Sequence, residues 1–294
     1  MTGPWRVRVA MVMLGVLIVL RPGIGGGGDD GPAPGADLDL LLVVDETASM
    51  SALDHAGVRS RLEGVREDVG DIAEALPDSR FALVTFGRRA DPELPFTSDP
   101  QAVAAAIEGI TREPLLAGTG STMSRPLPDV RGMLRRAAEE HPDRRQVLVF
   151  ASDGENTSTT ERQRSFAPVQ EYVEGGAVLG YGTPQGARMP TGGEPPWTFV
   201  RDRATGADAI SRLDEGNLQR IAQQLGVDYT RRGNSESLTD WARGLTRGSS
   251  GGGDDGGKGE EIYWVLAALL AGLAVLELRY DVLALREARE AVGP

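Results

Sequence analysis

The feature that most constrains the fold is a series of apolar runs of strand length, with helical patterns between them. The runs are LDLLLVVD at 38–45, RFALVTFG at 80–87, RQVLVFASDG at 145–154 and GAVLGYG at 176–182. A continuous apolar run predicts a strand that is buried on both faces, as in parallel sheets. The sequence therefore predicts an α/β fold with a Rossmann-like, doubly wound and mostly parallel sheet that carries helices on both faces.

Between these runs, apolar residues recur at the spacing of an amphipathic helix. The first such pattern comprises Val58, Leu62, Val65, Val69, Ile72 and Leu76. Further helices are expected near 100–110, 125–140, 166–174, 218–225 and 237–246, with a last strand at 226–231. In sheets of this kind, ligands bind outside the carboxyl ends of the strands, so the residues at those ends are the candidates for function.

Two short apolar segments lie outside this α/β region, and glycine-rich linkers at 25–36 and 248–261 separate them from it. We expect residues 9–24 to form a transmembrane or signal-anchor segment and residues 262–278 to form a transmembrane helix. The first segment could instead be a cleaved signal peptide, and the second a buried helix. The folded domain is then expected at 37–247.

Basic residues beside the two segments predict how the chain crosses the membrane. Arginines lie on the outer side of each segment: Arg6, Arg8, Arg279, Arg286 and Arg289. Flanks rich in arginine and lysine stay in the cytoplasm. We therefore expect cytoplasmic tails at 1–8 and 279–294, and a cell-membrane protein whose folded domain lies on the extracytoplasmic side.

Composition argues against several classes of function. The 294 residues include no cysteine, so the chain has no disulfide framework, no thiol nucleophile and no cysteine-based metal site. Its formal net charge is -12. An acidic surface repels phosphate backbones, so we expect no nucleic-acid partner.

Oxygen-bearing side chains gather at two strand ends and in one loop. The first strand ends in Asp45, followed by Thr47 and Ser49, and the third run ends with Asp153. The loop AGTGSTMSRPL at 117–127 is rich in small and hydroxyl residues. Hard oxygen donors of low total charge favour Mg²⁺, then Mn²⁺ or Ca²⁺. A site with only two carboxylates leaves the ion to keep waters or to accept an Asp or Glu from a partner protein.

This order of motifs resembles the metal-ion-dependent adhesion site (MIDAS) of von Willebrand factor A domains, and the resemblance covers nearly all of 38–246. It implies a divalent metal ion held by Asp45, Thr47, Ser49, a hydroxyl of the middle loop, and Asp153. Thr47 stands where serine is commoner in the family, and it keeps the hydroxyl group.

The middle loop departs from the family pattern, which usually has G-G-T followed by an apolar residue two positions on. Aligning Met123 and Leu127 with the family's apolar positions places Ser121 where the threonine belongs. Thr119 and Thr122 are the competing ligands. The resemblance therefore implies Ser121 as the ligand from this loop.

Two stretches resemble the membrane-anchored bacterial A-domain proteins of the aerotolerance-operon (Bat-like) type. They are FALVTF within 80–87 and TGADAISRLDEGNLQRIAQQLGVDYTR at 205–231. Such proteins are typically encoded beside AAA+ ATPases of the MoxR group. The resemblance implies a role in envelope protein assembly, maturation or stress handling, with a MoxR-type ATPase as an implied partner.

We predict a binding protein and not an enzyme. Phosphatases of the haloacid dehalogenase type also place an aspartate after the first strand and use Mg²⁺. They need a second aspartate where this chain has Thr47, and a catalytic lysine, whereas Lys258 lies in a linker. A surface adhesin and a metal-free scaffold are also compatible with these residues. Glu46, His55 and His141 are expected at the surface.

Overall fold

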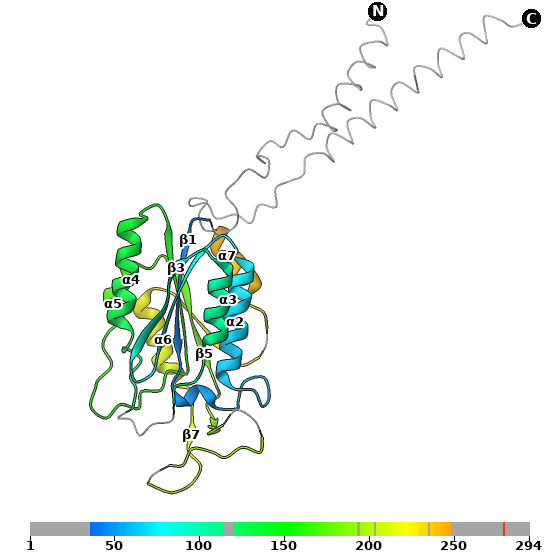
Figure 1. Cartoon of the computed structure of the whole chain (residues 1–294), viewed down its shortest axis with the longest axis vertical. Coiled ribbons are helices and arrows are strands. Elements are labelled where there is room, and N and C mark those ends of the chain that lie inside the picture. The colour runs from blue at the N-terminus through cyan, green and yellow to red at the C-terminus, as the bar shows by residue number, and fades with distance from the viewer. Residues whose placement is uncertain are drawn as a thin grey trace, which may run out of the picture. The chain divides into compact units, whose positions relative to one another are not determined.

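A six-stranded sheet forms the centre of the domain (Figure 1). The structure is a computed structural model that describes residues 36–247, apart from 115–119, 193–194, 203 and 235, together with Arg279. The strands are β1 (Leu38–Asp45), β2 (Arg80–Phe86), β3 (Ala90–Thr97), β4 (Arg145–Ser152), β5 (Gly175–Tyr181) and β8 (Asp228–Arg232). Their order is β3-β2-β1-β4-β5-β8, and every neighbouring pair is parallel except β2 and β3. The predicted α/β fold with a mostly parallel sheet is confirmed.

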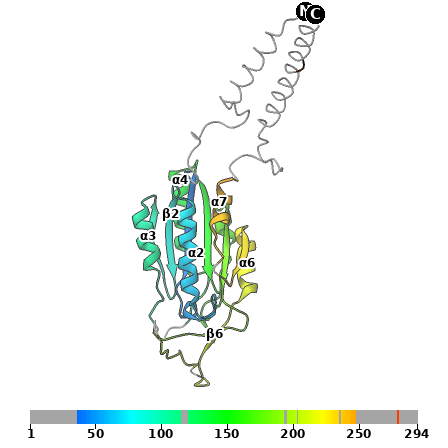
Figure 2. The ribbon, with the colours of Figure 1, turned by 90° about the vertical axis from the view of Figure 1, so that its right-hand side faces the viewer.

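Helices cover both faces of the sheet, as predicted. Three lie on one face: α2 (Arg61–Ala75), α3 (Pro100–Gly109) and α7 (Thr239–Arg247) (Figure 2). Three lie on the other: α4 (Leu127–Glu140), α5 (Ala167–Gln170) and α6 (Glu215–Leu225). β1 supplies both cores, because Leu40 and Leu42 belong to the α2 side and Leu41 and Val43 to the α4 side. Full burial of each such side chain contributes about 1.5–3 kcal/mol.

The edge strand β3 was not predicted. It pairs with β2 in the antiparallel direction and with shifts in register. Its sequence includes Pro92 and Pro95, which argue against a strand in the middle of a sheet. Both prolines are tolerated because β3 has only one neighbouring strand.

Three predicted helices have different bounds in the structure. The helix expected from Val58 begins at Arg61, because the Ser60 side chain caps it, and Val58 lies exposed in the turn before it. The helix expected at 166–174 forms only a single turn, Ala167–Gln170. The helix expected from residue 218 begins at Glu215, because the Asp214 side chain caps it and accepts a hydrogen bond from the Asn217 backbone N–H at 3.0 Å.

The predicted membrane segments at 9–24 and 262–278, and the linkers beside them, lie outside the described residues. Within the part of the chain that the structure describes, none of the helices combines the length and the apolar character that crossing a membrane requires.

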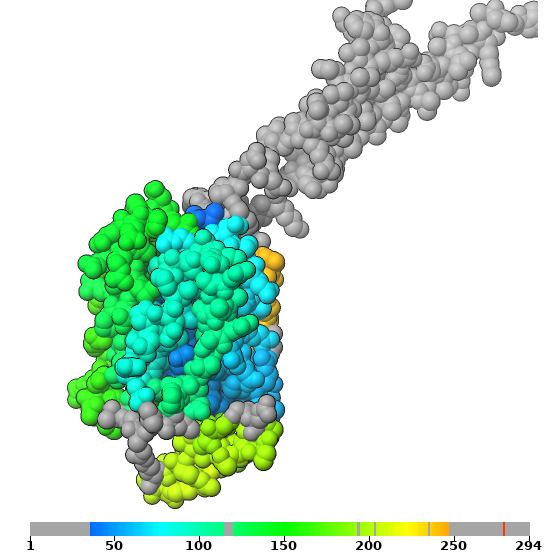
Figure 3. Space-filling view, in the orientation of Figure 1, coloured from blue at the N-terminus to red at the C-terminus, as the bar shows by residue number. Residues whose placement is uncertain are grey.

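The connection between β5 and α6, residues 183–213, lies at the carboxyl ends of the parallel strands (Figures 1 and 3). It includes the small sheet formed by β6 (Ala187–Arg188) and β7 (Ile210–Ser211). Leu53, just after the 3₁₀ helix η1 (Ala48–Ser51), donates a backbone hydrogen bond to Arg188. The 183–213 segment therefore lies beside the chain that leaves β1.

The start of β5 requires a glycine at one position. Gly176 has a φ of 132°, and a Cβ atom there would lie 1.9 Å from the Leu148 carbonyl oxygen of β4. We expect Gly176→Ala to lower the free energy of unfolding by more than about 2 kcal/mol, measured by urea denaturation. Gly175→Ala is the matched control, because a Cβ there meets nothing within 4 Å. Equal stability of the two variants would contradict this expectation.

Candidate metal centre

Asp45 is the last residue of β1, and its carboxylate is completely buried. Oδ1 accepts a hydrogen bond from the Thr47 backbone N–H at 2.9 Å, and Oδ2 accepts one from the Ser152 hydroxyl at 2.6 Å. Burial, and then the nearby charge of Asp153, raise the pKa of Asp45 to about 7. The carboxylate is therefore held in place by neutral donors that do not cancel its charge.

Thr47 and Ser49 lie in the turn that leads from β1 into η1. Thr47 occupies the N-cap position of η1, but its hydroxyl makes no capping hydrogen bond. Instead the hydroxyl oxygens of Thr47 and Ser49 lie 2.7 Å apart and share one hydrogen bond. Each oxygen keeps lone pairs for a further partner, so the turn presents two neighbouring hard oxygen donors.

Asp153 directly follows β4, and it too is completely buried. Its Oδ1 accepts a hydrogen bond from the Glu155 backbone N–H at 3.0 Å. Its Oδ2 lies 2.7 Å from Nη1 of Arg61, with which it forms a buried ion pair. One oxygen of this candidate ligand is therefore already bound to a cation of the protein.

Ser121 lies in the loop before α4 and makes no hydrogen bond to the other candidate ligands in the described residues. Its backbone N–H donates to the Thr157 hydroxyl at 3.0 Å. The loop nevertheless reaches Asp45, because the Ser152 hydroxyl also contacts the Met123 sulfur at 3.0 Å. Of the two competitors, Thr122 is buried with its hydroxyl 3.3 Å from that of Ser124, and Thr119 lies outside the described residues.

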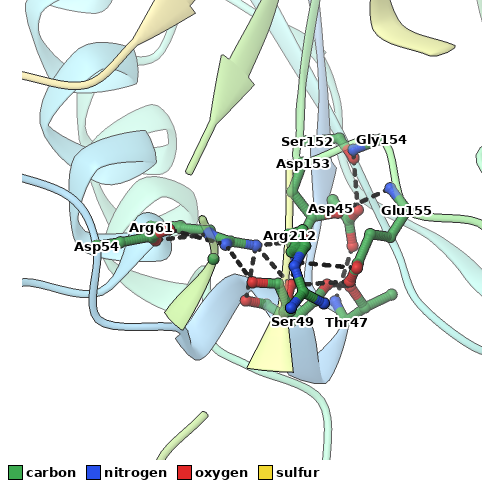
Figure 4. A network of polar contacts seen from close by, with 12 residues as sticks. Asp45, Thr47, Ser49, Asp54, Arg61, Ser152, Asp153, Gly154, Glu155 and Arg212 are labelled. Carbon is green, nitrogen blue, oxygen red and sulfur yellow. Dashed lines mark hydrogen bonds and ion pairs between the residues drawn. The ribbon is translucent and has the colours of Figure 1, made fainter. Parts of the chain in front are cut away.

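Arg61, which sequence reasoning missed, is the first residue of α2 and is completely buried (Figure 4). Its guanidinium pairs with both oxygens of Asp54, at 2.8 and 3.0 Å, and with Asp153. It also donates to the hydroxyl of Ser211 at 2.7 Å and to its carbonyl at 3.1 Å. An arginine at the start of an amphipathic helix usually reaches solvent, so nothing in the pattern indicated this burial.

Glu155, also missed, connects the same network to the 183–213 segment. Its carboxylate accepts hydrogen bonds from the Ser211 hydroxyl at 2.8 Å and from the Arg212 backbone N–H at 2.9 Å. Burial, and then the charge of Asp153, raise its pKa. Asp54 makes a similar link, since it accepts hydrogen bonds from Thr183.

The charges of this network test whether a divalent cation fits. Four carboxylates, those of Asp45, Asp54, Asp153 and Glu155, belong to it, and the only fully buried cation among its described residues is Arg61. Asp54 and Asp153 both pair with Arg61, whereas Asp45 forms no ion pair among the described residues, so a divalent ion beside Asp45 would supply the missing positive charge. Among the described residues, no three histidine, cysteine, aspartate or glutamate side chains form a metal-binding group. The candidate donors include only two carboxylates and otherwise hydroxyl groups, which fit a hard ion such as Mg²⁺.

The expectations for Glu46, His55 and His141 are only partly met. His55 was expected at the surface, but it is 1% exposed and packs near Tyr181, because the turn at 53–60 folds over α2. Glu46 is half-buried, and its carboxylate accepts a hydrogen bond from the Thr111 backbone N–H at 3.2 Å. His141 is exposed, as expected.

Comparisons with known proteins agree with the fold of this domain. Residues 40–155, which include β4, most of β1 and all the candidate ligands, match the von Willebrand factor type A domain family. The described domain has the fold of a von Willebrand factor type A domain and is called the A domain below. No curated protein matches the sequence.

Two solved structures have the same fold as this A domain. One is the conserved hypothetical protein BatB from Bacteroides thetaiotaomicron, with 24% identity and a TM-score of 0.56 over 71% of this chain and 96% of that one. The other is an aerotolerance-related membrane protein from Bacteroides fragilis, with 24% identity and a TM-score of 0.60 over 71% of this chain and 98% of that one. At this identity the likeness establishes the fold of the A domain.

Proposed function

We propose that the A domain binds one divalent cation, Mg²⁺ in the first place, and uses it to bind an acidic side chain of a partner protein. The observation that carries this proposal is the burial of Asp45 and Asp153 without enough positive charge to balance them. Thr47 and Ser49 supply the neighbouring hydroxyl oxygens. Because Asp153 is already paired with Arg61, Asp45 alone would face the ion with an unpaired charge, and a carboxylate from outside would complete the ion's charge and coordination.

The candidate ligands would hold the ion in two ways, directly or through a water molecule. Asp45, Thr47 and Ser49 would hold it from the turn after β1, and Ser121 from the loop before α4. Asp153 would act through water, because its Oδ2 is bound to Arg61. When bound, the ion supplies a Lewis-acidic position for the partner's carboxylate. We propose no catalytic role.

Placement in the cell is part of the proposal. We propose that segments 9–24 and 262–278 anchor the chain in the cell membrane, with the A domain on the extracytoplasmic side. One of the structures of this fold comes from a membrane protein described as aerotolerance-related. We propose a role in envelope protein assembly or maturation, together with a MoxR-type AAA+ ATPase.

A test of this function is retention of a partner on the immobilised full chain. Solubilised envelope proteins of the source organism are applied in Mg²⁺ and eluted with EDTA. We expect a protein that is retained by the wild type and released by EDTA. Thr47→Val, which keeps the shape and loses the hydroxyl, is expected to retain less than about a tenth as much. Thr47→Ser is the matched control and keeps retention. Retention that is indifferent to both EDTA and Thr47→Val would contradict the proposal.

The second candidate is a metal-free scaffold, and one observation favours it. Arg61 already places a positive charge against Asp153 inside the network. A resident guanidinium can take over part of a metal ion's role in balancing buried carboxylates. In this case the network would be structural, and partner binding would not depend on a metal ion.

A further inference from the structure

A pocket of about 370 Å³ opens beside the candidate metal centre, between the turn at 53–60, the start of α2 and the 183–213 segment. Ser51, which lines it, ends η1 and follows the candidate ligand Ser49 by two residues. Figure 2 shows the start of α2 at the same end of the domain as β6. The pocket and the candidate metal centre therefore share one end of the A domain.

The pocket is positively charged although the chain is acidic. Arg59, Arg66 and Arg112 line it, and Glu63 is the one carboxylate among its lining residues. The net charge of the whole chain is -12. Oε2 of Glu63 accepts hydrogen bonds from the backbone N–H and the hydroxyl of Ser60, at 2.6 and 2.7 Å, and so belongs to the helix cap. Arg59 is already paired with Glu67 at 2.8 Å, so the excess positive charge of the pocket comes from Arg66 and Arg112.

Two of these guanidinium groups contact only backbone oxygens in the described residues. Arg66 donates to the Ile110 carbonyl at 3.4 Å. Arg112 donates to the carbonyls of Glu113 and Thr191, each at 3.3 Å. Neither guanidinium forms an ion pair with a carboxylate within the described part of the chain, although the charge of Arg66 acts on Glu63 in the same pocket. A carboxylate that entered the pocket could form a charge-assisted hydrogen bond with either one.

The rim of the pocket presents a fixed apolar side chain. Val58 is 71% exposed and lies in a tight turn closed by two backbone hydrogen bonds of 3.1 Å between His55 and Arg59. Ala56 and Gly57, within the turn, both have positive φ angles, of 41° and 102°. Such angles are unfavourable for alanine, so the fold holds this turn against local preference. Because the turn already holds Val58 in place, this segment of the chain loses little conformational entropy when a partner binds.

The opposite wall contains an unsatisfied hydrogen-bond donor. Trp197 lines the pocket, and its indole Nε1 is buried without a hydrogen-bond partner in the described residues. Buried polar groups in proteins are nearly always paired. Because the Nε1 atom is itself buried, a segment bound in the pocket would meet the indole ring and not this donor, and the ring provides apolar surface.

We propose that this pocket is a second anchoring site for the partner, and that it binds a peptide segment in which an apolar side chain lies next to carboxylates. The apolar side chain packs against Val58 and Trp197, and the carboxylates pair with Arg66 and Arg112. The inference rests on the proposed function, since the same partner would also offer an acidic side chain to the metal ion.

The test uses the purified full chain in detergent and a fluorescein-labelled peptide with blocked ends. In this peptide one leucine lies between two glutamates, flanked by glycines. Fluorescence anisotropy is recorded in EDTA, so that the metal centre takes no part. We expect saturable binding by the wild type, and binding weakened at least about tenfold in Arg112→Glu and in Val58→Ser. Arg135→Glu, at an exposed position on α4, is the matched control and is expected to bind like the wild type.

Several outcomes would overturn the inference. They are an absence of binding by the wild type, equal binding of a peptide with lysines in place of the glutamates, and equal binding by Arg112→Glu. A dimer of the chain that Arg112→Glu dissociates would assign the pocket to a second copy, and would also overturn it. Peptide binding that survives while the wild type binds no metal ion would defeat the proposed function alone. Metal binding without peptide binding would defeat the pocket proposal alone.

Discussion

Asp45→Asn is expected to abolish the rise in melting temperature that Mg²⁺ gives the wild-type chain. A ligand at a hundred times its dissociation constant stabilises the folded state by about 2.7 kcal/mol. Loss of the charged ligand weakens metal binding by at least about a hundredfold, so that at this concentration little of the stabilisation remains. The measurement is thermal unfolding of the full chain at pH 8, in Mg²⁺ and in EDTA.

The same substitution should leave the metal-free fold intact. The pKa of Asp45 rises from its usual 3.8 to about 7 in the folded domain. A carboxyl group whose pKa is raised by folding stabilises the folded state when it is protonated. This contribution is fully present at a pH below the pKa of the unfolded chain, and it is lost as the pH rises through the folded-state pKa of about 7. Asparagine carries no such charge, so Asp45→Asn in EDTA at pH 8 is expected to be at least as stable as the wild type.

An exposed aspartate provides the control for this experiment. Asp78 lies at the surface after the end of α2, and Asp78→Asn is expected to keep the wild-type response to Mg²⁺. A Mg²⁺-dependent rise that persists in Asp45→Asn would show that the ion binds elsewhere. A collapse of the metal-free Asp45→Asn variant would show that the carboxylate is needed for folding itself.

Arg61→Met is expected to cost about 3–5 kcal/mol of unfolding free energy in EDTA, because it leaves buried carboxylates without their cation. The guanidinium is 0% exposed and pairs with both Asp54 and Asp153. Mg²⁺ should restore part of the loss, since a divalent ion near Asp153 replaces some of the missing positive charge. Urea denaturation in EDTA and in Mg²⁺ measures both effects.

A neighbouring arginine gives the matched control. Arg59 pairs with Glu67 at 2.8 Å, but both side chains are more than a third exposed. Exposed ion pairs contribute about 0–1 kcal/mol, so Arg59→Met is expected to change stability by no more than that. If Arg61→Met behaved like Arg59→Met, the buried ion-pair network would not hold this end of the domain together.

Most of the sheet could be predicted from the sequence, because strands buried on both faces leave an unmistakable apolar run. β1 and β4 are of this kind, and their carboxyl ends bring Asp45 and Asp153 together. β3 could not be predicted, because an edge strand needs no apolar run and tolerates Pro92 and Pro95.

The candidate metal ligands could be predicted from the sequence, but the residues that interact with their charges could not. Arg61 lies far along the chain from Asp153 and shows no motif that marks it as buried. Glu155 resembles any polar residue after a strand, and its role depends on Ser211 in a segment without regular pattern. Ser121 stays a prediction from the family alignment, since its hydroxyl contacts only Thr157 in the described residues.

The measurement that tests the central claim most directly is a titration of the full wild-type chain with Mn²⁺, with free Mn²⁺ followed by electron paramagnetic resonance. The proposed metal centre predicts saturable binding of a single ion per chain, competed by Mg²⁺ and absent in Asp45→Asn. An absence of saturable binding by a wild-type chain that is folded by circular dichroism would contradict the claim and favour the metal-free scaffold.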